Sequence, residues 1–214
     1  YYKRRVYALV YTIHHYTGCR TKELLNLKWR HITINPNDNA FDRKTNRIVH
    51  IPADNSKTGR SRDIIAPIGQ QIERLIRWYR EMGLEVDQKS DRYVFPRLTD
   101  TTKNENIPTS DVAWTKRLRN VLASAERDGV IDLNGRNISN YCARHHHITE
   151  AIQRGVDIYD IALNCGTSLN YIEKTYSHIT TLMRSKDLTK GLGRQATYDP
   201  MKDEDYLKAT RMGE

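Results

Sequence analysis

Apolar residues recur at intervals of three and four along much of the chain, the spacing of helices that bury one face. Residues 2–16 show this spacing first, and the Thr17-Gly18 dipeptide interrupts it. We expect a second helix over about residues 19–29, with Thr17 or Thr21 capping its start. Further helices are predicted over residues 68–82, 111–128, 139–154, 157–165 and 168–178.

The pattern changes between residues 31 and 67, where short β-prone runs are separated by Asn, Asp, Pro and Gly. Residues 32–34, 48–51 and 63–66 form these runs, and we expect them to pair as a small antiparallel sheet. Lys57-Thr58-Gly59 lies between the second and third runs and predicts a turn. The expected fold is therefore mainly α with a small antiparallel β-sheet, an α+β fold.

The composition is basic, with 35 Lys and Arg against 26 Asp and Glu and a formal net charge of +9. Such a charge attracts polyanions, so we expect nucleic acid as the partner. No apolar run reaches the roughly 18 residues of a membrane span, and no signal peptide is visible. Cys19, Cys142 and Cys165 are odd in number and widely spaced, which fits neither a disulfide framework nor a paired-cysteine zinc site.

A length of 214 residues fits one large domain, with or without a terminal appendage. We expect this domain over residues 1–182 and a charged C-terminal tail over residues 183–214, with one further helix at residues 203–212. The chain opens with Tyr1 inside a predicted helix. It is therefore expected to be a fragment of a longer protein.

Five short segments, spaced along the chain, contain the candidate catalytic residues. Residues 17–29, TGCRTKELLNLKW, place Arg20 and Glu23 three apart on one helix face, and residues 56–62, SKTGRSR, lie in the predicted hairpin. The segments YCARH at 141–145, NCGTS at 164–168 and KTYSH at 174–178 follow, with Tyr176 ten residues after Gly166. In this order and spacing they resemble the catalytic domain of the tyrosine recombinase (phage integrase) family, over roughly residues 5–182.

The resemblance implies a role for each matching residue. Arg20 and Arg144 would bind the scissile phosphate, and Glu23 would support the site. Lys57 would be delivered by the hairpin as the general acid, and Tyr176 would be the nucleophile. The implied function is a site-specific recombinase or integrase that cleaves and rejoins DNA through a 3′-phosphotyrosine intermediate.

Two positions depart from the family pattern. Tyr141 stands where the family has histidine, and Thr167 stands where it has histidine or tryptophan. Tyr141, Arg144 and His145 fall at i, i+3 and i+4, so one helix face carries all three. His145 is the candidate base, with Tyr141 and Thr167 as candidate phosphate contacts. The identity of the proton acceptor stays open.

The proposed chemistry follows from these residue types. Guanidiniums make two-point contacts with phosphate oxygens, and a phenol with a reference pKa of about 10 needs a base or nearby cations to attack. A phosphotyrosine ester keeps the bond energy of the phosphodiester, so no cofactor is expected. The His145-His146-His147 run predicts no metal site, because adjacent helix residues diverge by about 100°.

The resemblance also implies partners and surroundings. These are double-stranded DNA, a homotetramer on paired sites, an N-terminal DNA-clamping domain in the intact protein and an accessory DNA-bending protein. A cytoplasmic, bacterial or phage-encoded protein of a mobile element is expected, without membrane contact. The tail is either mobile or docked on a neighbouring protomer. Alternatives left open are a type IB topoisomerase-like enzyme, a catalytically impaired DNA-binding protein of the same fold, and a metal-dependent nuclease of the three-carboxylate type.

Overall fold

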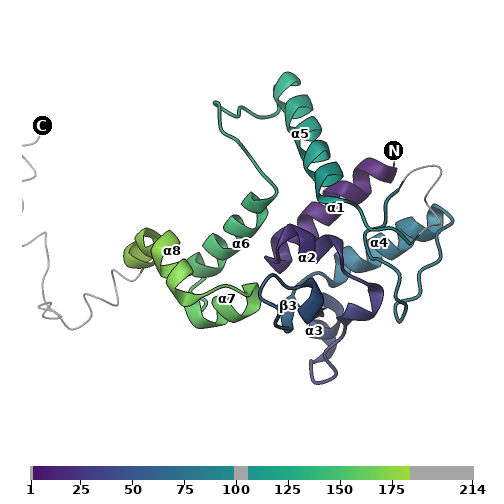
Figure 1. Ribbon diagram of the computed structural model, residues 1–214, viewed down its shortest axis with the longest axis horizontal. Helices are drawn as coiled ribbons and strands as arrows, with labels where there is room; N and C mark the ends of the chain where they lie inside the picture. The colour runs from purple at the N-terminus through teal and green to yellow at the C-terminus, as the bar shows by residue number, and fades with distance from the viewer. Residues whose placement is uncertain (1, 99–105, 184–214) are drawn as a thin grey trace, which may run out of the picture. The chain divides into compact units, whose positions relative to one another are not determined.

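The computed structural model describes residues 2–98 and 106–183 (Figure 1). The chain divides into two compact units, Tyr1–Ser177 and His178–Glu214, and the sheet and all predicted site residues lie in the first. Residues 184–214, and with them the helix expected at 203–212, lie outside the described residues. Within the described residues, no helix has both the length and the apolar character that a bilayer crossing requires.

Eight α-helices and three strands make up the described residues. The helices are α1 (Tyr2–Thr17), α2 (Thr21–Leu25), α3 (Ala40–Thr45), α4 (Gly69–Glu81), α5 (Asp111–Arg127), α6 (Tyr141–Gln153), α7 (Ile158–Cys165) and α8 (Leu169–Met183). The strands are β1 (Ile32–Thr33), β2 (Arg47–Ile51) and β3 (Arg62–Ala66), with short 3₁₀ turns at Trp29–His31 and Ala53–Asn55. Most of the predicted helices and all three predicted strands are confirmed, together with the turn at Lys57.

The second predicted helix is wrong in length and in its cap. α2 ends at Leu25, because the next residues pair with a distant segment: the Leu27 carbonyl accepts from the Val94 amide at 2.8 Å. The helix is capped by Arg20, whose amide donates to the Glu23 carboxylate at 2.8 Å, and neither Thr17 nor Thr21 has this part. The Thr17 hydroxyl instead donates back to the Ile13 carbonyl at 2.9 Å.

α3 was not expected from the sequence. Its N-cap is Asn39, whose side chain accepts hydrogen bonds from the amides of Phe41 and Asp42. None of its residues is buried, so it lacks the apolar stripe by which a helix is recognised in a sequence.

The three strands form one antiparallel sheet in the order β1-β2-β3. Val49 of β2 pairs with Ile32 on one side and with Ile64 on the other, and alternate residues of β2 and β3 face the core. α1 packs against both α4 and α6, and α7 packs against β3. The Ile65 amide donates to the Asn164 side chain at 2.9 Å, which fixes the end of α7 to the edge of the sheet.

Candidate active site

Arg20 lies at the start of α2, where the chain turns away from α1. Its Nη1 donates to Glu23 Oε1 at 2.8 Å, and its Nη2 donates to the Gly166 carbonyl at 2.7 Å. The Arg20 side chain keeps 21% of its surface exposed. The first predicted phosphate-binding arginine is therefore held in place by α2 and by the end of α7, with part of its side chain still open to solvent.

Glu23 is buried and holds a second guanidinium that the sequence did not single out. Arg62 Nη2 and Nη1 donate to the two carboxylate oxygens at 2.7 and 3.2 Å. Burial alone would raise the pKa of Glu23, but hydrogen bonds from Arg62 and Arg20 outweigh it and lower the pKa, so the group is a carboxylate at neutral pH. Arg62 lies on the same face of β3 as the buried residues Ile64 and Ala66, and strand alternation could have indicated this inward direction.

Arg144, on α6, is the largest fully buried side chain of the described residues, with 1% of its surface exposed. Its Nη1 donates to the carbonyls of Gly18 and Cys165, both at 2.7 Å. Its Nε is buried and has no hydrogen-bond partner among the described residues. Arg144 thus joins the turn before Arg20 to the end of α7.

Gly166 is the point at which these cations converge. It ends α7 in the left-handed conformation, with a φ of 63°. A Cβ at this position would lie 2.6 Å from Cζ of Arg62, so the close approach of that guanidinium also requires glycine. Both the left-handed conformation and the close approach of Arg62 thus require glycine at position 166, which gives a physical reason for glycine in the NCGTS segment.

Tyr176, on α8, exposes 4% of its surface, and its hydroxyl lies 2.5 Å from Nδ1 of His145. Burial raises the pKa of Tyr176 above its usual value, nearby Tyr171 and Tyr141 raise it further, and the charge of Arg144 works against them. Burial, followed by the charge of Arg144, lowers the pKa of His145 below 6.5. At neutral pH the imidazole is therefore neutral and able to accept a proton.

Two further tyrosines lie beside this pair. Tyr141 is 38% exposed, and its ring meets that of His145 edge-on with centroids 4.7 Å apart. Tyr171 forms side-chain hydrogen bonds with Tyr141 and Thr175, and burial raises its pKa. Sequence reasoning missed Tyr171, because no motif marks a residue whose partners come together only when α6 and α8 are placed.

The side chains of Lys57 and Thr167 form no hydrogen bond to the other site residues in the described part of the chain. Lys57 is exposed on its turn, and within the described residues it forms no hydrogen bond or ion pair. The turn is anchored just before it, since Asn55 Nδ2 donates to the Glu23 carbonyl at 2.9 Å. The Thr167 amide donates to the Ala162 carbonyl at 3.0 Å, and no hydrogen bond of its hydroxyl to a described residue is present.

The remaining predicted site residues come together, from segments far apart in the chain. Arg20 binds Glu23 and the Gly166 carbonyl, and Arg144 binds the neighbouring Cys165 carbonyl. Tyr141 and Tyr176 both contact His145, the residue after Arg144 on α6. Two guanidiniums, of Arg20 and Arg62, bind the Glu23 carboxylate, and a third, of Arg144, is held by backbone carbonyls beside them. The excess of positive charge suits this site to an anion, and the neutral imidazole suits it to proton transfer. Both oxygens of Glu23 already accept from arginines, so this carboxylate is a poor metal ligand.

Comparison with known proteins gives a consistent result. The family model described as "Phage integrase family" matches residues 3–182. The solved structure of XerH site-specific recombinase bound to difH substrate, a pre-cleavage complex, is 19% identical and has a TM-score of 0.58 over 90% of this chain and 47% of its own. XerA recombinase is 18% identical, with a TM-score of 0.52 over 91% of this chain and 64% of its own. No curated protein matches.

The Tn1549 transposon integrase, in complex with circular intermediate DNA, is 14% identical and has a TM-score of 0.50 over 96% of this chain and 56% of its own. This chain spans about half the length of the XerH chains that it matches. At such identities the likeness shows the fold, and it confirms the expected helical domain with a small antiparallel sheet. The chain belongs to the phage integrase family and has the fold of a tyrosine recombinase catalytic domain.

Proposed function

We propose that this chain carries the catalytic centre of a site-specific DNA recombinase, which cleaves and rejoins strands through a 3′-phosphotyrosine bond at Tyr176. The observation that carries the proposal is the 2.5 Å contact between the Tyr176 hydroxyl and His145, beside the buried Arg144. Arg20 reaches the same loop, since it binds Gly166 while Arg144 binds Cys165.

The arginines are suited to a backbone phosphate. Arg20 Nη2 and Arg144 Nη1 are held by neutral backbone carbonyls, which orient the guanidiniums. The charge of Arg144 is left uncancelled by these bonds, while Arg20 also pairs with Glu23 through Nη1. Arg144 Nε is buried and has no partner among the described residues, so it is a further donor that a phosphate oxygen could use. Preorganised donors of this kind contribute roughly 3 kcal/mol each to the transition state.

Strand cleavage transfers the phosphate from the 5′ oxygen to Tyr176. The phenol proton of Tyr176 passes to His145 Nδ1, the phenol oxygen forms a bond to phosphorus, and the bond from phosphorus to the 5′ oxygen breaks. The leaving 5′ oxygen takes a proton from Lys57. This requires the exposed turn at Lys57 to move onto bound DNA, since no contact holds Lys57 at the described site residues. Attack by the freed 5′ hydroxyl of a second strand reverses the same steps.

The partners are proposed on the same basis. The net charge of +9 supports binding to double-stranded DNA, and two solved structures of similar fold are DNA complexes. We extend the proposal to a tetramer on paired sites, an N-terminal DNA-clamping domain and a bacterial or phage-encoded, DNA-associated protein. The domain of residues 1–182, followed by a tail that docks on a neighbouring protomer or stays mobile, also remains a prediction.

Covalent capture tests the proposed nucleophile. A pool of nicked duplexes with a randomised core is incubated with the chain, and denaturant-resistant protein–DNA adducts are recovered and sequenced. Tyr176→Phe should abolish the adduct, and Tyr159→Phe, at an exposed position of α7, should leave it unchanged. An adduct that persists in Tyr176→Phe and disappears in Tyr171→Phe would assign the reaction to the neighbouring phenol instead.

A catalytically impaired DNA-binding protein is the second candidate. The observations that favour it are the raised pKa of Tyr176, the lack of a contact between Lys57 and the other site residues within the described part of the chain, and the changes at Tyr141 and Thr167. Salt-sensitive binding to duplex DNA without any adduct would select this function over the first. No observation on this structure favours a topoisomerase-like enzyme or a metal-dependent nuclease.

A further inference from the structure

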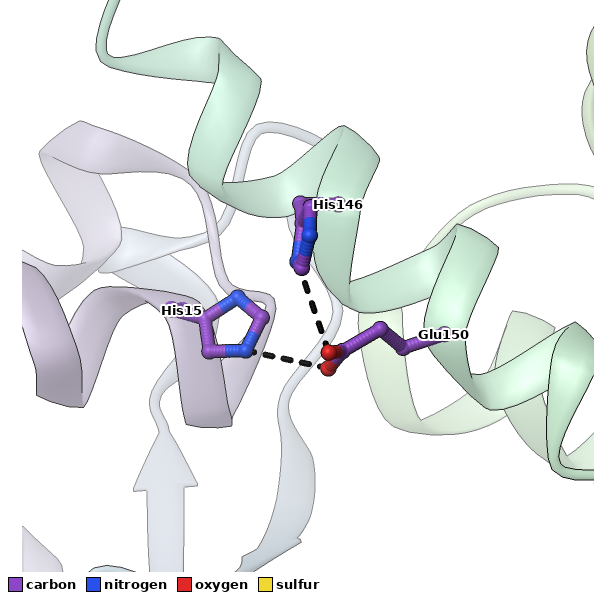
Figure 2. A group of neighbouring side chains, drawn as sticks. All are labelled: His15, His146 and Glu150. Atoms are coloured by element: carbon purple, nitrogen blue, oxygen red, sulfur yellow. Dashed lines mark ion pairs between the residues drawn. The ribbon is translucent and has the colours of Figure 1, made fainter. Parts of the chain in front are cut away.

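A second cluster of reactive side chains lies outside the catalytic centre, where α1 and α6 pack together. Its members are His15 of α1 and His146 and Glu150 of α6, and their ligand atoms all lie within 4.8 Å of one another. His15 Nε2 is 3.1 Å from Glu150 Oε2, and His146 Nδ1 is 3.8 Å from Glu150 Oε1. Figure 2 shows both imidazoles and the carboxylate pointing toward a common point.

We propose that these three residues form a binding site for a divalent late transition metal, zinc above all. Two imidazole nitrogens and one carboxylate oxygen are a ligand set that zinc takes at about 2.0–2.2 Å, with water in the fourth position. The separation of 3.1 Å between His15 and Glu150 already suits such a site, and the 3.8 Å between His146 and Glu150 is somewhat wide. Rotation of side chains closes the difference, because His146 exposes 63% of its side chain and Glu150 exposes 38%.

The backbone holds the three residues ready. His146 and Glu150 are four apart on α6 and therefore share one face. The side chain of His147 makes a hydrogen bond to the backbone of His15 and packs against Gly18, where a Cβ would lie 2.4 Å from Cδ2 of the ring. This contact fixes the end of α1 against α6, so the position of His15 is set by the fold.

One charge near the cluster favours a cation, and another competes with it. His15 lies in the last turn of α1, where the unpaired carbonyls of a helix end attract positive charge. Arg154 Nη1 lies 3.9 Å from Glu150 Oε2 and is the cation that a metal would have to displace. It exposes 61% of its side chain, so displacing it to solvent is cheap.

The three consecutive histidines thus have three different neighbours. His145 binds the Tyr176 hydroxyl, His147 binds the His15 backbone, and His146 alone turns to the cluster. The sequence argument against a metal held by adjacent histidines therefore stands. It did not detect this site, because His15 lies 131 positions before His146 in the chain.

A bound metal would join α1 to α6, the helix that carries Arg144 and His145. It binds the folded chain and not the separated helices of the unfolded one. At a free metal concentration 100 times the dissociation constant, the unfolding equilibrium constant should fall by about 100-fold.

Calorimetric titration tests the site, using the chelator-treated chain without a histidine tag and zinc chloride as the probe. We expect one zinc ion per chain, an increase in melting temperature with zinc, and neither effect with magnesium. His15→Gln, His146→Gln and Glu150→Gln should each weaken binding by at least about tenfold, the loss caused even by removing a supporting partner of a metal ligand. Each variant is first compared with the parent chain by circular dichroism.

The matched control is His50→Gln. His50 Nδ1 and Asp63 Oδ1 lie 2.7 Å apart, so this pair offers a histidine and a carboxylate elsewhere on the surface, and no described residue adds a third ligand to it. The control should bind zinc as the parent chain does. If no zinc binds, if the cluster variants bind as tightly as the parent, or if His50→Gln abolishes the binding, the proposal is wrong. His146, the most exposed ligand, gives a variant that disturbs the fold least.

Discussion

Replacing Arg62 with alanine tests how firmly one buried carboxylate organises the phosphate-binding end of the site. Glu23 exposes 1% of its side chain and accepts from Arg62 at 2.7 and 3.2 Å and from Arg20 twice at 2.8 Å. Arg62→Ala removes the first two of these hydrogen bonds and leaves the carboxylate buried. Removing one partner of a buried ion pair costs about 3–5 kcal/mol. Because Arg20 still pairs with Glu23, we expect a loss of stability at the lower end of this range, about 3 kcal/mol.

Urea unfolding followed by circular dichroism measures this loss. With a slope of about 1–3 kcal/mol per molar urea, the midpoint should fall by about 1–3 M. The pKa of Glu23 is lowered below 4.5 in the folded protein, so the carboxylate stabilises the fold above pH 4.5 and this stabilisation is lost as the pH falls through the folded pKa. With Arg62 absent, burial has fewer opposing donors and the pKa rises. The difference between parent and variant should therefore shrink in acid.

Arg60→Ala is the matched control, since Arg60 is an exposed arginine two residues earlier in the same connection. Its free energy of unfolding should stay within about 0.5 kcal/mol of the parent value. The double variant of Glu23→Gln and Arg62→Ala should lose less than the sum of the single losses, as expected of groups in contact. If Arg62→Ala costs no more than Arg60→Ala, the buried pair does not stabilise the site and the reasoning fails.

Two further predictions concern the proton acceptor and the loop. The rate of adduct formation should rise with pH through a folded His145 pKa that lies below 6.5, because only the neutral ring accepts the phenol proton, and His145→Ala should lose this dependence. A parent pH profile that the variant reproduces would contradict the assignment. Gly166→Ala should destabilise the chain by more than about 2 kcal/mol, since it adds a Cβ 2.6 Å from Arg62 Cζ to the strain of a φ of 63°. Gly59 has a φ of 66° but open space around it, so Gly59→Ala should cost only about 1 kcal/mol. Equal losses of stability for Gly166→Ala and Gly59→Ala in thermal unfolding would refute the packing argument.

Much of the fold follows from local patterns in the sequence. The apolar periodicity of α1 and α4 and the alternation in β2 and β3 are set by which face each element buries, and the structure confirms them. α2 is shorter than its leucines suggested, because the Leu27 carbonyl accepts a hydrogen bond from the Val94 amide. The two residues are 67 positions apart, so a local pattern cannot predict this bond. α3 has a capping asparagine but buries no face, so periodicity has no signal there.

The candidate site also contains residues that the sequence indicates and residues that only the structure reveals. Arg20, Glu23, Arg144 and Tyr176 could be found because motif spacing marks them, and the structure places them round the end of α7 and the His145 ring. Arg62 and Tyr171 are defined by partners from other elements, and no local pattern reveals a contact made only in three dimensions. The roles of all these residues stay predictions until the adduct is measured.

The contacts of the three guanidiniums suggest why only part of this charge is available to DNA. Arg62 is bound to Glu23 through two nitrogens, so its charge is largely neutralised inside the protein. Arg144 is held only by carbonyl oxygens among the described residues, which direct the side chain without cancelling its charge, and Arg20 combines both kinds of partner. A phosphate entering the site would therefore reach the partly exposed Arg20 first, and it would meet the field of the buried Arg144 without having to break an ion pair of Arg144. The buried pair of Glu23 and Arg62 keeps Arg20 and the loop at Gly166 in position while this happens.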